Sequence, residues 1–153
     1  QEGKHSEWFD DGKLAGDTFY KKGTGTLKLV YQNGNKLVQG ARKSGKRNGL
    51  WTWWDDKGNK TQEAIFNMGS GPYTQWWPGG NKRRAGSVKD EQDDGAYKEW
   101  HENGQLMWDG AYKNDSQHGT WTKYSATGQK EYTLCYMDHW LVRISACSTG
   151  MLN

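Results

Sequence analysis

The strongest constraint on this chain is a regular spacing of glycines. One glycine recurs at intervals of 22 or 24 residues, and a second glycine follows each of them nine residues later. The two sets are Gly3, Gly25, Gly49, Gly71, Gly95 and Gly119, and Gly12, Gly34, Gly58, Gly80, Gly104 and Gly128. Six units in register fill residues 3 to about 139. The sequence therefore predicts a fold built from tandem repeats.

Large side chains occupy two fixed positions of each unit, two and five residues after the first glycine. Leu, Ile, Val and Phe together make up only 18 of the 153 residues, whereas there are ten Trp and eight Tyr. A core of this chain must therefore be built from aromatic rings. The predicted structural core of the repeats comprises Trp51, Trp54, Tyr73, Trp76, Tyr97, Trp100, Trp121 and Tyr124.

The second glycine of each unit predicts the turn of a β-hairpin. Asp11-Gly12, Asn33-Gly34 and Asn103-Gly104 favour two-residue turns in which both central residues have positive φ. Lys57-Gly58 and Thr127-Gly128 fit such turns less well and indicate a longer, bulged turn. After the turns, side chains alternate with the period of two that is typical of strands. Polar segments, such as residues 43–48 and 113–118, are expected to link one hairpin to the next.

The repeat pattern resembles the bacterial variant of the MORN repeat. The resemblance is carried by Tyr112-x-Asn114-x-x-x-x-Gly119-x-Trp121-x-x-Tyr124-x-x-x-Gly128 and by Gly95-x-Tyr97-x-x-Trp100-x-x-Asn103-Gly104. The same repeat occurs in proteins of the YwqK antitoxin family. The resemblance implies an all-β fold: about six tandem β-hairpin repeats of 22–24 residues form one elongated, twisted antiparallel sheet. It implies little about function.

Two features fit the pattern less closely. His5 and Leu27 stand where an aromatic residue is expected, which marks the first two units as capping or degenerate repeats. Choline-binding and glucan-binding repeats are a second, weaker resemblance. Their paired aromatic residues are contiguous, as Trp53-Trp54 and Trp76-Trp77 are here.

The repeat array is expected to span residues 1–139, with units starting near residues 3, 25, 49, 71, 95 and 119, and residues 140–153 to form a C-terminal capping segment. This segment begins with the most apolar stretch of the chain, residues 140–144. It could cover the open edge of the sheet, or it could pair with the sheet of a partner. Cys135 and Cys147 are compatible with one disulfide and also with two free thiols.

A single-layer sheet cannot bury both of its faces, so some rings are expected to be available to a partner. Adjacent tryptophans in a strand point to opposite faces, which places one member of each pair on the face away from the core. Trp, Tyr and Arg dominate the energetics of protein interfaces, so the favoured partner is another protein or a larger complex. The predicted partner-binding residues are Trp53, Trp77, Trp108 and Trp140.

Three other roles for the exposed rings remain open. The rings could stack on a linear polysaccharide, the chain could act as an antitoxin-like partner of a toxin, or it could contact lipid head groups. The favoured role is a non-catalytic scaffold, acting as an accessory subunit of a larger cell-envelope or extracellular assembly.

Composition and motifs argue against several other functions. A mean hydropathy of −1.13 and the absence of an apolar run near 18 residues exclude a membrane-spanning helix. Because 21 basic residues are balanced by 18 acidic ones, nucleic-acid binding is not expected. No catalytic motif and no zinc-like spacing of Cys and His is present, so we expect no enzyme, no cofactor and no metal. The first residue, Gln1, suggests removal of a signal peptide and a location in the periplasm, at the cell surface or outside the cell.

Overall fold

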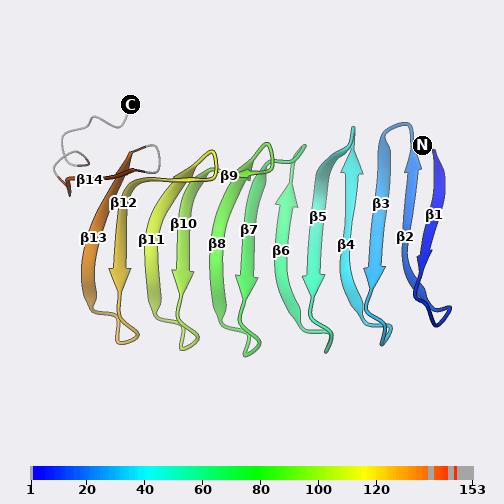
Figure 1. The fold of residues 1–153 in the computed structure, drawn as a ribbon, viewed down its shortest axis with the longest axis horizontal. Helices are drawn as coiled ribbons and strands as arrows, with labels where there is room; N and C mark the ends of the chain where they lie inside the picture. The colour runs from blue at the N-terminus through cyan, green and yellow to red at the C-terminus, as the bar shows by residue number, and fades with distance from the viewer. Residues whose placement is uncertain (1, 138–139, 145–146, 148–153) are drawn as a thin grey trace. The chain divides into compact units, whose positions relative to one another are not determined.

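The structure is a computed structural model that describes residues 2–137, 140–144 and 147 (Figure 1). These residues form fourteen strands in one open sheet, and consecutive strands along the path are antiparallel neighbours in chain order. The predicted all-β fold of tandem hairpins in an antiparallel sheet is therefore confirmed. The chain divides into two compact units, Gln1–Tyr73 and Thr74–Asn153, and each unit is described on its own below.

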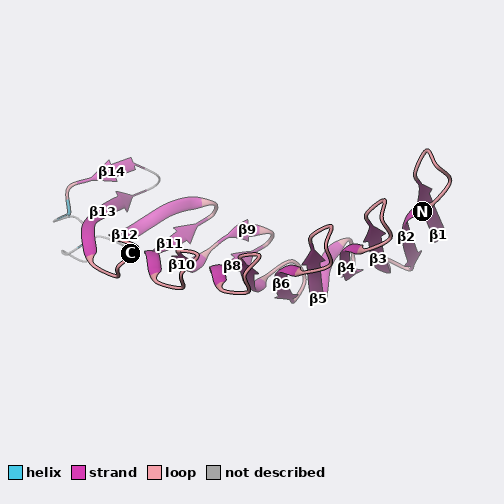
Figure 2. Cartoon of the chain, turned by 90° about the horizontal axis from the view of Figure 1, so that it is seen from below, coloured by secondary structure: helices cyan, strands magenta, loops and turns pink. Residues whose placement is uncertain are grey.

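The strands of the first unit alternate with short loops (Figure 2). They are β1 (Gly3–Trp8), β2 (Leu14–Lys21), β3 (Thr24–Val30), β4 (Lys36–Lys43), β5 (Lys46–Trp54) and β6 (Lys60–Phe66), and β7 (Gly71–Trp76) crosses the boundary between the units. The second unit contains β8 (Lys82–Lys89), β9 (Gln92–Asp93), β10 (Gly95–Trp100), β11 (Leu106–Lys113), β12 (Ser116–Tyr124), β13 (Lys130–Met137) and β14 (Trp140–Val142). The two-residue strand β9 lies off the main path and pairs with β8.

The six hairpin loops at the second glycines share one geometry, which differs from the predicted one. In the loop that follows β3, the Tyr31 N–H donates to the Asn35 carbonyl (2.8 Å) and the Gly34 N–H donates to the Tyr31 carbonyl (2.8 Å). Only the glycine has a positive φ, which is 87° for Gly34. This is a three-residue loop that ends in a left-handed residue. The predicted two-residue turns with two positive φ angles are therefore wrong, whereas Lys57-Gly58 and Thr127-Gly128 do use the longer turn.

Two-residue turns with two positive φ angles occur instead in the segments predicted to be links. Ser44 and Gly45 have φ angles of 49° and 78°, and the residues that flank them, Lys43 and Lys46, are Cα partners in the ladder of β4 and β5. Equivalent pairs are Lys22-Gly23, Met68-Gly69, Asp90-Glu91 and Asn114-Asp115. The polar links are therefore tight turns between paired strands, and the sheet continues from each repeat unit into the next.

Apart from Cys135, the buried hydrophobic side chains of each unit lie on one face of the sheet. In the first unit, Val38, Trp51, Ala64 and Phe66 are buried. In the second, Tyr97 and Trp121 are buried on the corresponding face, where the Trp121 ring lies 5.4 Å from the Tyr97 ring and 5.1 Å from the Tyr112 ring. We call this face of each unit the aromatic face.

The C-terminal segment adds the last strand to the sheet. Strand β14 pairs with β13 through Cys135↔Val142, Tyr136↔Leu141 and Met137↔Trp140. A disulfide joins Cys135 to Cys147, and Cys135 is buried to 1% exposure. The disulfide therefore ties Cys147 to β13, an alternative that the sequence left open.

Candidate partner-binding surface

A row of five side chains crosses the aromatic face of the second unit. Glu99 is the Cα partner of both Arg84 and Trp108, Trp108 is the partner of Lys123, and Lys123 is the partner of Tyr132. Because directly opposed residues of antiparallel strands project to the same side, these five side chains share a face. We call Arg84, Glu99, Trp108, Lys123 and Tyr132 the aromatic row.

The aromatic row is held together by ring contacts and by charge. The Trp108 ring lies 6.0 Å from the buried Trp121 ring and 5.9 Å from the Tyr132 ring, both at steep interplanar angles. The Lys123 Nζ lies 4.8 Å from the centre of the Trp108 ring, within the range of a cation–π contact. Trp108 is half-buried, and Tyr132 is 48% exposed. The row thus presents fixed aromatic surface to solvent.

Glu99 anchors the other end of the aromatic row. Its Oε1 lies 3.1 Å from Arg84 Nε, and its Oε2 accepts a hydrogen bond from the Tyr97 hydroxyl at 3.0 Å. The Glu99 side chain is only 13% exposed, which removes most of the water around its carboxylate. The contacts with Arg84 and Tyr97 offset the free-energy cost of this desolvation. Burial, and secondly the negative charge of Glu99, raises the pKa of the Tyr97 hydroxyl. Tyr97 therefore stays a hydrogen-bond donor well into alkaline solution.

Trp53 lies in the first unit at the position that corresponds to Lys123, four residues after the first glycine of its repeat. The Trp53 and Trp51 rings are 5.8 Å apart, and Val38, the Cα partner of Trp53, is buried. The prediction that Trp53 lies on the face away from Trp51 is therefore wrong. Residues two apart in a strand share a face, and the register shift between β5 and β6 comes only after Trp53.

Trp77 begins the loop that follows β7 and does not lie within a strand. Its Nε1–H donates to the Trp100 carbonyl at 3.1 Å, and the Arg83 guanidinium lies 4.7 Å from the centre of its ring. Other loops repeat this link to the following hairpin: the Tyr31 hydroxyl donates to the Trp54 carbonyl at 2.9 Å. The geometry thus gives Trp77 a structural contact in addition to its predicted role in partner binding.

The remaining predicted residues are distributed as follows. Trp140, in β14, is 75% exposed. Of the predicted core, Trp51, Tyr97 and Trp121 are buried, whereas the others are half-buried: Trp54, Tyr73, Trp76, Trp100 and Tyr124. The Lys36 Nζ lies 5.2 Å from the centre of the Trp54 ring, and the Lys82 Nζ lies 5.9 Å from that of Trp100. Trp54 and Trp100, each five residues after the first glycine of its repeat, are thus partly covered by lysine side chains.

Sequence reasoning missed four members of the aromatic row: Arg84, Glu99, Lys123 and Tyr132. They occupy two positions of the repeat, four and thirteen residues after the first glycine. Unlike the core position, these positions hold no constant residue type. These residues could be identified only from the register of the paired strands, and that register cannot be assigned until the turn lengths are known.

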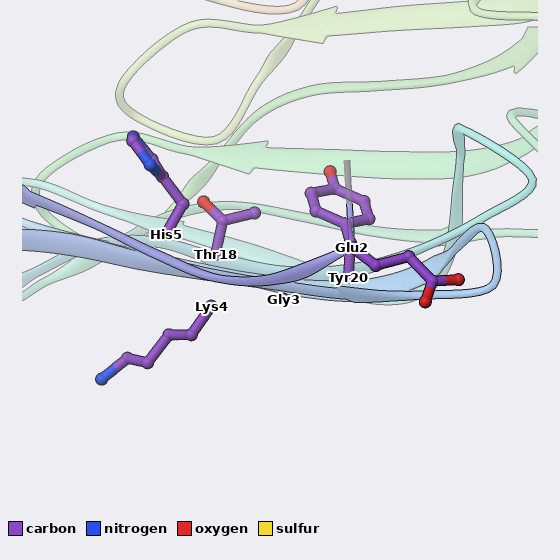
Figure 3. A pocket seen from close by; sticks show the side chains of 6 residues that line it. All are labelled: Glu2, Gly3, Lys4, His5, Thr18 and Tyr20. Atoms are coloured by element: carbon purple, nitrogen blue, oxygen red, sulfur yellow. The ribbon is translucent and has the colours of Figure 1, made fainter.

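A hollow of about 310 Å³ lies beside β1 and β2. Figure 3 shows His5 and Thr18 on one side of the ribbon and Lys4 on the other. His5 occupies the position that holds a buried ring in later repeats, and its side chain is 74% exposed. The hollow therefore lies where the first repeat has an exposed histidine in place of a core ring. Among the residues that the structure describes, no group of His, Cys, Asp and Glu could hold a metal ion, and no helix could span a membrane.

The geometry defines a tandem-hairpin repeat fold in which each of the two units has an aromatic face. Three stretches of the chain, residues 1–22, 93–114 and 117–138, match the MORN repeat variant. These three stretches thus match the repeat variant that the residue pattern resembles, although the match gives no support to the YwqK relation. Repeats of this family are generally non-catalytic and typically form scaffolds that bind proteins or membranes.

Comparisons with whole proteins add little. No curated protein matches the chain. Among solved structures, the "Crystal Structure of TarM" is similar at 8% identity, over 58% of this chain and 20% of that chain, with a TM-score of 0.36. The match thus spans about a fifth of TarM, and the likeness is too slight to support an argument.

Proposed function

We propose that this chain is a non-catalytic repeat scaffold whose aromatic row binds another protein. The observation that carries the proposal is the partial exposure of Trp108 and Tyr132 beside a core that is already filled by Tyr97 and Trp121. Tryptophan, tyrosine and arginine are the residues that dominate binding energy at protein interfaces. The aromatic row contains one of each, together with a lysine and a carboxylate.

Preorganisation supports this role. Trp108 packs against Trp121 and Tyr132 and is covered by the Lys123 amine, while Glu99 holds Arg84. Side chains that are already fixed lose little conformational entropy when a partner docks. The row therefore suits a partner that presents an apolar patch flanked by hydrogen-bond acceptors for Arg84 and Lys123.

We further propose that the protein is an accessory subunit of a larger assembly in the cell envelope or outside the cell. The disulfide between Cys135 and Cys147 supports such a location, because disulfides persist in oxidising compartments. The generally non-catalytic character of the repeat family supports an accessory role.

The test begins with the native particle, isolated gently from its source, with co-purifying proteins identified by mass spectrometry. Binding of the identified partner is then compared for Trp108→Phe, Tyr132→Ala and Phe19→Ala. Phe19 is the matched control because it is 48% exposed, as is Tyr132, and it lies in the first unit. Tyr132→Ala is expected to weaken binding by about tenfold or more, Trp108→Phe by less, and Phe19→Ala not at all.

Two outcomes would overturn the proposal. In one, all three variants bind the partner as tightly as the unmodified chain. In the other, the chain is a monomer without partners, and its tryptophan fluorescence responds to soluble oligosaccharides, as the polysaccharide alternative predicts. Relief of a toxin's growth arrest by the chain would favour the antitoxin alternative if Tyr132→Ala left that relief intact.

A further inference from the structure

Exposed apolar side chains cross the first unit on its far face, the face opposite its aromatic face. Leu50 precedes the buried Trp51 in β5, so the two side chains project to opposite faces. Ile65 is the Cα partner of Leu50 and therefore shares its face. Leu50 is 55% exposed and Ile65 is 60% exposed. The chain thus places two of its scarce aliphatic side chains side by side in solvent.

Strand pairing extends this apolar surface across β4, β3 and β2. Thr26 is the Cα partner of both Ala41 and Phe19, and Phe19 is 48% exposed. Thr26, Ala41 and Leu50 line one hollow of about 370 Å³, which places all three on the same face. An exposed apolar surface that is continuous over several strands is typical of an interaction site. We call Phe19, Thr26, Ala41, Leu50 and Ile65 the far-face strip.

The same positions of the second unit carry no such surface. Thr120 stands one residue after the first glycine of its repeat, where the first unit has Leu50. Cys135, the Cα partner of Thr120, corresponds to Ile65 and is 1% exposed because it is bonded to Cys147. The far-face strip is therefore particular to the first unit. A position that the chain itself covers in the second unit is exposed there.

The far-face strip has flanks of opposite charge. Residues two places along a strand share a face, so the flanks are read from the strand sequences. On the side of the tight turns they include Lys21 and Lys43. On the side of the hairpin loops they include Asp17, Lys28 and Glu63. One flank is thus positive, and the other carries more carboxylates than amines.

We propose that the far-face strip binds the far-face strip of a second copy of the chain. A two-fold axis that runs along the strip, across the strands, lays each apolar side chain on its own equivalent. The same axis exchanges the flanks, so that Lys21 of one copy faces Asp17 of the other. Two sheet faces then pack about 10 Å apart, as in a β-sandwich.

This contact uses only the first unit of each copy. An isologous contact satisfies both copies at once and ends as a dimer, because each copy offers the same surface. Apolar burial supplies the attraction, and the opposed flanks fix the direction of the axis. The inference is independent of the proposed role of the aromatic row, which lies in the second unit.

Sedimentation velocity of the full chain tests the proposal. A dimer is expected at a chain concentration of about 100 µM, and it should persist in about 500 mM NaCl, because salt does not screen apolar burial. Leu50→Thr with Ile65→Thr is expected to weaken the dimer by at least about tenfold. Threonine favours strands and already stands at position 120, so the far-ultraviolet circular dichroism of the variant should be unchanged.

The matched control is Leu141→Thr with Ile144→Thr. It makes the same two substitutions at positions that are 62% and 55% exposed and lie outside the far-face strip, and it should leave the dimer intact. Lys21→Glu should weaken the dimer several-fold, because the new carboxylate then faces Asp17. Lys130→Glu makes the same change of charge at an exposed position of the second unit and should have no effect.

Four outcomes would overturn the proposal. The first is a monomer at about 100 µM, and the second is a dimer that survives Leu50→Thr with Ile65→Thr. The third is equal weakening by the control pair, which would assign the contact to the C-terminal segment. The fourth is binding of a monomer to vesicles of neutral phosphatidylcholine, which would assign the far-face strip to a membrane surface. Equal dimerisation of Lys21→Glu and Lys130→Glu would contradict the direction of the two-fold axis.

Discussion

The indole ring of Trp121 lies directly against the backbone of Gly110. A Cβ atom on Gly110 would overlap the ring, and the Trp121 Nε1–H donates to the carbonyl of Ala111 at 3.0 Å. Trp51 and Gly40 repeat the arrangement in the first unit, with a hydrogen bond of 2.8 Å to the Ala41 carbonyl. This contact shows how a single-layer sheet builds a core: a large ring on one strand fills the space over a glycine on its neighbour.

Replacement of Gly110 by alanine is expected to displace the Trp121 ring. Overpacking of this kind typically costs about 1–3 kcal/mol, so the thermal midpoint should fall by several degrees. Gly79→Ala is the control, because a Cβ there meets no atom within 4 Å and its φ is not positive. Equal melting temperatures for the two variants would show that the ring can move aside without loss.

Trp77→Phe removes the hydrogen bond from Trp77 to the Trp100 carbonyl and retains most of the ring surface. We expect a loss of about 1 kcal/mol in the free energy of unfolding, measured by denaturant titration. Trp140→Phe is the comparison, since Trp140 is 75% exposed. If Trp77→Phe is as stable as Trp140→Phe, the hydrogen bond between consecutive hairpin loops contributes nothing to folding.

Much of this fold could be predicted from the spacing of glycines alone. That spacing indicated hairpins and the all-β class, and two residues after the first glycine it located Trp51, Tyr97 and Trp121, which are buried. It could not assign the turn types, because a glycine tolerates positive φ in either kind of turn. The tight turns contain residues such as Asp90 and Glu91, and the pair Asp-Glu in a sequence does not by itself predict a turn with two positive φ angles.

The aromatic row was harder to predict for the same reason. Trp108 was predicted to bind a partner because it is aromatic. Its Cα partners Glu99 and Lys123 are charged residues of a kind that is common in exposed strands, so the sequence did not distinguish them. The assignment of faces failed at Trp53 because it started from the adjacent pair Trp53-Trp54. The register shift at that point shows that simple alternation does not hold between those two residues.

The disulfide between Cys135 and Cys147 is expected to stabilise the chain by restricting its unfolded state. For a sequence separation of 12 residues, the expected contribution is about 3 kcal/mol. Denaturant titration of Cys147→Ser should show this loss, and Cys135→Ala with Cys147→Ser should show a similar one. Addition of a thiol reductant should lower the stability of the unmodified chain and leave that of the double variant unchanged. A reductant effect on the double variant would assign the loss to something other than this bond.

The raised pKa of Tyr97 predicts how stability depends on alkaline pH. Burial raises the pKa of the hydroxyl in the folded state, and the Glu99 carboxylate raises it further. The unfolded chain therefore ionises first, at a pH of about 10, and the free energy of unfolding should fall as the pH rises above that value. Tyr97→Phe should be less stable than the unmodified chain near neutral pH, because it lacks the hydrogen bond to Glu99, and should lose less stability between about pH 9 and 11. Glu99→Gln removes the negative charge, so tyrosinate absorbance from Tyr97 should develop at a lower pH than in the unmodified chain. Parallel stability curves for Tyr97→Phe and the unmodified chain would contradict the assignment of the alkaline loss to Tyr97.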